Sequence, residues 1–151
     1  MPVVQKIRPL HVLVAEDTPV NQLVTRKMLE LGGHTVELVN NGEAAIECFK
    51  KGYFDLILMD LQMPLLDGRD ATRRIRELEA ATGLHTPIIA LTAHAMQGDA
   101  DLCLAAGMDG YLTKPLKRSE LSSALARFFM PSSPTINTSS TVSGEQEFWP
   151  K

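Results

Sequence analysis

The stretch of sequence that decides the fold is FDLILMD, residues 54–60. Its centre is an apolar run, Leu-Ile-Leu-Met at 56–59, in which polar and apolar residues do not alternate. Such a run is typical of a strand that is buried on both faces, as the central strands of parallel sheets are. We therefore expect a central strand over 54–59, followed directly by the ionisable residue Asp60.

Short apolar runs alternate with segments of helical period on both sides of this strand. Strands are predicted at 10–15, 35–39, 54–59, 87–91 and 110–113, and helices at 19–31, 43–51, 69–81, 100–106 and 119–129. This alternation indicates a doubly wound α/β fold, a flavodoxin-like (βα)5 arrangement with helices on both faces of a five-stranded parallel sheet. The strand order 2-1-3-4-5 fits best, because it places the first and third strands side by side at the switch point.

The first predicted helix has a start signal and an apolar period. Thr18 can cap the helix, and Pro19 suits its first position because the missing N–H has no partner there. Apolar residues then recur at helical spacing: Val20, Leu23, Val24, Met28 and Leu31.

Length and composition indicate one soluble domain. The 151 residues divide into an N-terminal extension at 1–9, a folded domain at 10–130 and a Ser/Thr/Pro-rich, flexible tail or linker at 131–151. A net charge of −3 argues against nucleic-acid binding, and no apolar run approaches the ~18 residues of a membrane helix. Cys48 and Cys103 are expected as small buried or half-buried hydrophobes, which suits a reducing cytoplasm.

Reactive side chains follow four of the five predicted strands. They are Glu16 and Asp17, Asp60, Thr92 and Lys114, each at the carboxyl end of its strand. In an open parallel sheet these ends form one rim, where ligands bind. Two carboxylates ~4 Å apart repel by roughly 4 kcal/mol at an effective dielectric near 20. Three carboxylates and one lysine leave about two negative charges, which a hard divalent cation such as Mg²⁺ would balance.

Asp60 is the candidate nucleophile of this rim. A carboxylate can attack phosphorus and carry an aspartyl phosphate. Thr92 can hydrogen-bond a phosphoryl oxygen, and Lys114 can pair with another. Each has an ordinary alternative, a strand-end cap for Thr92 and a surface lysine for Lys114, but all of them together at one rim would be an improbable coincidence.

Four stretches of the sequence resemble the motifs of response-regulator receiver domains of two-component signalling. They are VLVAEDTPVNQ, DLILMDLQMPLLDG, PIIALTAH and GYLTKPL, in the order of the family and across about residues 10–130. The DLQMPLLDG wording and the NQ opening of the first helix are most similar to receivers of hybrid sensor histidine kinases. The resemblance identifies the chain as a member of this family.

The resemblance implies a role for each rim residue. Asp60 accepts a phosphoryl group from a phosphohistidine. Asp17 binds Mg²⁺, or Mn²⁺ in its place, directly, Glu16 binds it mainly through water, and the backbone carbonyl of Gln62 completes the ligands together with Asp60. Thr92 and Lys114 hold the phosphoryl group, so that the domain catalyses its own phosphorylation and dephosphorylation.

The resemblance also implies a switch and partners. Tyr111 swings inward when Thr92 moves, Gln62 and His94 tune the phosphoryl lifetime, and Lys114-Pro115 is a cis peptide bond. The expected partners are a histidine kinase, a histidine phosphotransfer domain or both, and the family allows a homodimer through the fourth helix, fifth strand and last helix. Such a receiver works in the cytoplasm, free-standing or as the cytoplasmic part of a membrane-bound hybrid kinase.

Three other function classes fit the sequence less well. An aspartyl-phosphate phosphatase of similar sheet topology would typically carry a second Asp two residues after the nucleophile, and position 62 is Gln. An interaction module that has lost phosphorylation would not be expected to keep all of the rim residues. A flavin-binding protein is disfavoured because the loop at 61–68 has one glycine and no hydroxyl-rich phosphate cradle.

Overall fold

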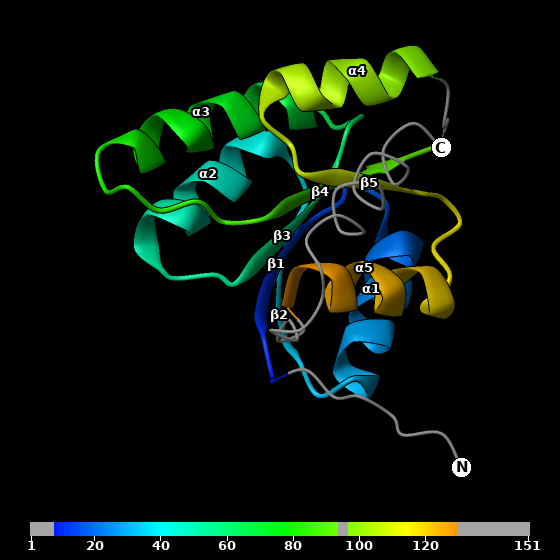
Figure 1. Ribbon diagram of the computed structural model, residues 1–151. Helices are drawn as coiled ribbons and strands as arrows, with labels where there is room; N and C mark the ends of the chain where they lie inside the picture. The colour runs from blue at the N-terminus through cyan, green and yellow to red at the C-terminus, as the bar shows by residue number, and fades with distance from the viewer. Residues whose placement is uncertain (1–7, 94–96, 130–151) are drawn as a thin grey trace, which may run out of the picture.

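The computed structural model describes residues 8–93 and 97–129, and it contains one parallel sheet between two layers of helices (Figure 1). The strands are β1 (His11–Ala15), β2 (Thr35–Val39), β3 (Leu56–Asp60), β4 (Ile88–Thr92) and β5 (Gly110–Thr113). The helices are α1 (Pro19–Leu31), α2 (Gly42–Lys51), α3 (Gly68–Ala80), α4 (Gln97–Ala106) and α5 (Arg118–Phe129). The order β2-β1-β3-β4-β5 confirms the predicted topology.

Two apolar cores lie on the two faces of the sheet. Alternate residues of β1 show the division, since Val12 and Val14 belong to one core and Leu13 and Ala15 to the other. Helices α1 and α5 cover the first core, and α2, α3 and α4 cover the second (Figure 1). All five residues of β3 are buried, as expected for a central strand that has helices on both sides.

Strand register explains why distant residues meet at one rim. Ala15 of β1 pairs with Met59 of β3, so Glu16 emerges beside Asp60. Asp60 in turn pairs with Leu91 of β4, and Thr92 pairs with Thr113 of β5, one residue before Lys114. Asp60 and Thr92 are the last residues of their strands rather than the first residues beyond them, because the parallel ladder with their neighbours extends that far.

Helix α1 corrects one detail of the sequence analysis. Thr18 stands at the N-cap with extended backbone, but its side chain makes no cap hydrogen bond and instead donates to Asp17 Oδ1 at 3.4 Å. The buried residues of α1 are Thr25 and Leu29, whereas much of the apolar stripe that indicated the helix is exposed: Val20, Leu23, Val24 and Leu31. Spacing therefore predicted the helix correctly but did not mark the side that packs on the sheet.

The two cysteines and the chain ends were also the subject of predictions. Cys48 is half-buried, Cys103 is buried, and neither forms a disulfide, as predicted. Among the described helices, none has the length and apolarity needed to cross a membrane. Most of the N-terminal extension and the tail lie outside the described residues, and His94 does too, so the boundaries at 1–9 and 131–151 stay predictions.

Candidate functional site

Three carboxylates meet at the carboxyl ends of β1 and β3. Glu16 and Asp60 are buried, Asp17 is exposed, and one oxygen of each lies within 4.8 Å of the others. Glu16 and Asp17 follow β1 directly, and the parallel pairing of β1 with β3 brings Asp60 beside them. The structure thus brings together the three acidic residues that the sequence predicted as metal ligands.

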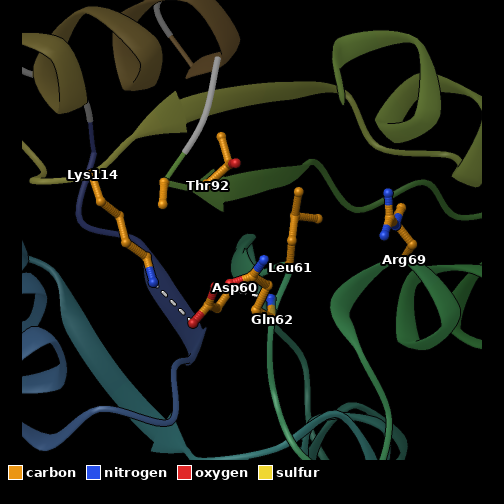
Figure 2. Close-up of a pocket in the computed structure, with 7 residues that line it drawn as sticks. Asp60, Leu61, Gln62, Arg69, Thr92 and Lys114 are labelled. Atoms are coloured by element: carbon orange, nitrogen blue, oxygen red, sulfur yellow. Dashed lines mark hydrogen bonds and ion pairs between the residues drawn. The ribbon is translucent and has the colours of Figure 1, made fainter. Parts of the chain in front are cut away.

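Lys114 reaches this cluster from the end of β5. Its Nζ lies 2.9 Å from Asp60 Oδ2 and 3.1 Å from Glu16 Oε1, and Figure 2 shows the side chain extended towards Asp60. The backbone N–H of Lys114 donates to the carbonyl oxygen of Thr92 at 2.8 Å, which ties the ends of β4 and β5 together. The Lys114-Pro115 peptide bond is cis, as predicted.

Burial and charge set the protonation of the central pair. Burial raises the pKa of Asp60 to about 6, although the hydrogen bonds from Lys114 and from the Gln62 N–H act in the opposite direction. Burial also acts to lower the pKa of Lys114, but the hydrogen bonds to Asp60 and Glu16 outweigh it and raise that pKa above its ordinary value. Lys114 is therefore a permanent cation beside a carboxylate that is costly to leave charged.

Residues at the start of α1 hydrogen-bond to Glu16. Glu16 Oε2 accepts from the Thr18 N–H at 3.2 Å and from Asn21 Nδ2 at 3.4 Å, while Gln22 Nε2 donates to the Glu16 backbone carbonyl at 2.6 Å. Glu16 Oε1 is buried, and the cation beside it among the described residues is Lys114 Nζ at 3.1 Å, which it shares with Asp60. A buried carboxylate oxygen in this state is unfavourable without a further cation.

The loop between β3 and α3 fixes the other side of Asp60. The Gln62 N–H donates to Asp60 Oδ1 at 3.1 Å, and the Gly68 N–H donates to the Leu61 carbonyl at 3.1 Å. A Cβ at Gly68 would collide with the backbone carbonyl of Asp60, so only glycine permits α3 to start this close to Asp60. The Asp67-Gly68 turn signal predicted a turn here but not this close approach.

A cavity of about 140 Å³ opens between these loops. It is lined by Asp60, Leu61, Gln62, Arg69, Thr92, Ala93 and Lys114, most of which Figure 2 labels. Thr92, predicted as a phosphoryl contact, is buried at its wall. Arg69 was not predicted as a site residue, because the sequence around it carries no signal that distinguishes Arg69 from the other arginines of α3.

Three further residues were predicted to act in switching or in the phosphoryl lifetime: Tyr111, Gln62 and His94. Tyr111 of β5 is half-buried and packs against the core beneath α2, α3 and α4. Gln62 is exposed and follows Asp60 by two residues, and its backbone N–H donates to Asp60 Oδ1. His94 lies outside the described residues, so its role in the phosphoryl lifetime stays a prediction.

The donor set fits a hard divalent cation. All candidate ligands are carboxylate oxygens, two of the three carboxylates are buried, and the single lysine that contacts them in the described part of the chain offsets only part of their charge. Mg²⁺ prefers such oxygen ligands and keeps several waters, which the exposed side of Asp17 permits.

The sequence of this chain is similar to those of known proteins. The response regulator receiver domain family matches residues 12–126 of the chain. Probable histidine kinase 2 of Oryza sativa subsp. indica is 44% identical over 135 residues, which cover 78% of this chain and 13% of the kinase. The chain therefore spans only a small part of the length of this relative.

Solved structures share the fold as well. The receiver domain of sensor histidine kinase PA1611 from Pseudomonas aeruginosa, crystallised with a magnesium ion in its active-site cleft, is 48% identical, with a TM-score of 0.72, over 80% of this chain and 97% of that chain. The receiver domain of Ssk1 from Saccharomyces cerevisiae, solved with the histidine phosphotransfer protein Ypd1, is 32% identical, with a TM-score of 0.77, over 83% of this chain and 92% of that chain.

Proposed function

The chain belongs to the family of response regulator receiver domains, and we propose that it is a phosphoacceptor switch that receives a phosphoryl group from a phosphohistidine on Asp60. The observation that carries this proposal is the setting of Asp60. Its carboxylate is buried, contacts a lysine at 2.9 Å and still lines a cavity large enough for a phosphoryl group. A merely structural carboxylate would have no reason to face such a space.

We assign the metal to the three carboxylates of the rim. Glu16, Asp17 and Asp60, with the backbone carbonyl of Gln62, would hold Mg²⁺, or Mn²⁺ in its place. When bound, the ion supplies positive charge that screens the carboxylates from phosphoryl oxygens. The buried Glu16 Oε1, which shares its one cation among the described residues, Lys114, with Asp60, supports this assignment.

The chain's own residues then position the reacting groups. A carboxylate oxygen of Asp60 forms the new P–O bond while the P–N bond of the phosphohistidine breaks, and the electron pair of that bond leaves with the imidazole. Lys114 Nζ, which already contacts Asp60 Oδ2, pairs with a phosphoryl oxygen, and the Thr92 hydroxyl donates to another. The Gln62 N–H holds the carboxylate in one orientation throughout.

The switch follows from the added charge. Phosphorylation adds negative charge and acceptor oxygens at Asp60, which draw Thr92 towards the group. Tyr111 then fills the space that Thr92 leaves, and the face of α4, β5 and α5 changes. A partner or second copy that binds this face shifts the equilibrium only by its differential affinity for the two states. Gln62 and His94, which follow Asp60 and Thr92 by two positions in the sequence, tune the lifetime of the phosphoryl group.

We propose a histidine phosphotransfer protein, a histidine kinase or both as the partner, acting in the cytoplasm. Helix α1 offers a surface for it, because Val20, Leu23 and Val24 are 66%, 55% and 40% exposed at its amino-terminal half. This apolar surface begins within one turn of Asn21, which contacts Glu16. A partner that docks there would bring its phosphohistidine to the rim. A complex with a histidine phosphotransfer protein, Ypd1, is known for the similar Ssk1 receiver.

The deciding experiment is intact-mass spectrometry after incubation with acetyl phosphate and Mg²⁺. The wild-type chain should gain one phosphoryl group, and Asp60→Asn should gain none, because it removes the nucleophile while keeping the shape of the side chain. A chelator should also suppress the gain.

Folding of Asp60→Asn is checked by thermal unfolding, so that loss of labelling reports chemistry. A fully labelled Asp60→Asn chain would show that another residue accepts the group. No labelling of the wild type under any condition would favour the interaction-module alternative.

A further inference from the structure

The cavity beside Asp60 has a second cation that the proposed reaction does not use. Arg69 is the second residue of α3 and lines the cavity together with Lys114. Figure 2 shows the two cations on opposite sides of Asp60, Lys114 coming from β5 and Arg69 from α3. The cavity thus presents a positive side chain on each side of the acceptor.

Arg69 and Arg74 are the two arginines of α3 without an ionic partner among the described residues, and of these two only Arg69 lines the cavity. Arg73 pairs with Asp70 at 2.6 Å, and Arg76 pairs with Glu79 at 2.6 Å and with Asp109 at 2.8 Å. Within the described part of the chain, the Arg69 guanidinium has neither an ion pair nor a hydrogen bond, although the residue is half-buried. Its donors therefore remain available to an anion in the cavity.

The position of Arg69 in its helix offers no structural reason for a cation. The first turn of a helix carries a partial positive charge and favours anions, as Asp70 in the same turn illustrates. An unpaired guanidinium there is mildly unfavourable to the helix. A ligand that carries negative charge would reverse this effect.

The balance of charges at the site also favours an interaction between Arg69 and an anion. A fully ionised aspartyl phosphate carries about two negative charges, and Glu16 and Asp17 add two more. A divalent ion and Lys114 supply three positive charges, so about one negative charge is left over. Arg69 is the remaining cation among the residues that line the cavity.

We propose that Arg69 is a donor-binding residue, which holds the phosphoryl oxygens of the incoming phosphodonor in the cavity before transfer to Asp60. This inference rests on the proposed function, and it names a residue for recognition of the substrate. A guanidinium suits this task because it donates to phosphate oxygens in a bidentate, charge-assisted manner. Loss of this contact should slow capture of the donor and leave the acceptor itself intact.

The test is the second-order rate constant for labelling by acetyl phosphate, followed by intact mass in the full chain with saturating Mg²⁺. Arg69→Gln should lower this constant by about tenfold, the effect of losing one charge-assisted contact, and Arg69→Lys should restore part of it. Arg74→Gln is the matched control, because Arg74 is on the same helix and exposed. It should behave like the wild type.

Ionic strength supplies a second readout that a structural role would not move. Salt screens the attraction between a guanidinium and an anionic donor, so the wild-type rate should fall with salt more steeply than that of Arg69→Gln. An unchanged rate and salt slope in Arg69→Gln would overturn the inference and leave the proposed function standing. An equal loss in Arg74→Gln, or no rescue by Arg69→Lys, would also overturn it. Failure of the wild type to label at Asp60 would instead overturn the proposed function.

Discussion

At the scale of single residues, the site depends on carboxylates that are held close together against their repulsion. Glu16 and Asp60 are both buried and share Lys114, whose Nζ contacts each of them at about 3 Å. One lysine cannot offset three carboxylates. The imbalance supports the proposed metal site, and we expect Asp17, the most exposed of the three, to contribute to metal binding rather than to the fold.

Asp17→Asn should therefore weaken Mg²⁺ binding by about tenfold or more, because affinity for a hard cation depends on the number of charged ligands. Isothermal titration calorimetry measures the change. Glu43→Gln, which removes an exposed carboxylate from the first turn of α2, is the matched control and should leave the affinity unchanged. Equal affinity of Asp17→Asn and wild type would show that the metal lies elsewhere.

At the scale of elements, α3 is tied to the sheet by polar contacts at the end opposite the site. Arg76 donates to Glu79, to Asp109 and to the carbonyls of Thr86 and Gly107. Glu79 is buried and also accepts from the Thr86 N–H at 2.6 Å. One arginine thus joins α3 to the segments that precede β4 and β5, which keeps the amino-terminal turn of α3 in place beside Asp60.

Arg76→Met should lower the free energy of unfolding by about 3 kcal/mol, because it leaves the buried Glu79 carboxylate without its cation. Urea denaturation at pH 7 measures the loss. The matched control is Arg73→Met, whose pair with Asp70 is exposed on the same helix and should contribute less than about 1 kcal/mol. Similar losses for the two variants would show that the network is not a buried anchor.

The turn between α1 and β2 carries a pH-sensitive contact. Buried His34 accepts a hydrogen bond from the Leu10 N–H through Nδ1 at 3.0 Å, which requires that nitrogen to be unprotonated. Burial lowers the pKa of His34 below its ordinary value of 6.5. Between the two values the unfolded chain binds a proton that the folded chain does not, so stability is lost as the pH falls below 6.5.

Urea denaturation at pH 7 and pH 5.5 should therefore show a loss of stability with a slope of at most about 1.4 kcal/mol per pH unit from this residue. His34→Gln keeps a side-chain acceptor near Leu10 but does not titrate in this range, so its slope should be smaller by that contribution. A variant with the same pH dependence as the wild type would assign the acid sensitivity to other groups.

At the scale of the whole molecule, the sheet order is what assembles the site. The order β2-β1-β3-β4-β5 places the ends of β1 and β3 together at the centre of the rim, with β4 and β5 following on one side. The two cores on the faces of the sheet involve all five helices, and within the described residues Phe128 and Phe129 near the end of α5 still pack against the core.

Deletion of residues 131–151 should consequently change the melting temperature by less than about 2 °C, since no core contact of the described fold is removed. Thermal unfolding followed by circular dichroism measures it. A deletion of 126–151, which also removes Phe128 and Phe129, is the contrasting variant and should lower the melting temperature clearly. A large drop for the shorter deletion would show that the tail docks on the domain.

The predictable part of this protein was the part with a local signal. The apolar run of β3 predicted a buried central strand, and the position of Asp60 after it predicted a carboxylate at the rim, because the carboxyl ends of parallel strands share one edge. The apolar period of α1 predicted a helix but not its orientation. Exposed Val20 and Leu23 and buried Thr25 show that periodicity does not distinguish a core face from a docking face.

The sequence by itself determined the elements, their parallel order and the identity of the rim residues, since each of these follows from periodicity, turn chemistry and reactive residues at strand ends. Only the tertiary structure decided that Gly68 abuts the Asp60 carbonyl, that Arg76 joins α3 to the segments before β4 and β5, and that Arg69 lines the cavity beside Asp60. These relations join residues through the packing of α3 on the sheet. Packing depends on the volumes and contacts of side chains from several elements at once, and no single stretch of sequence carries that information.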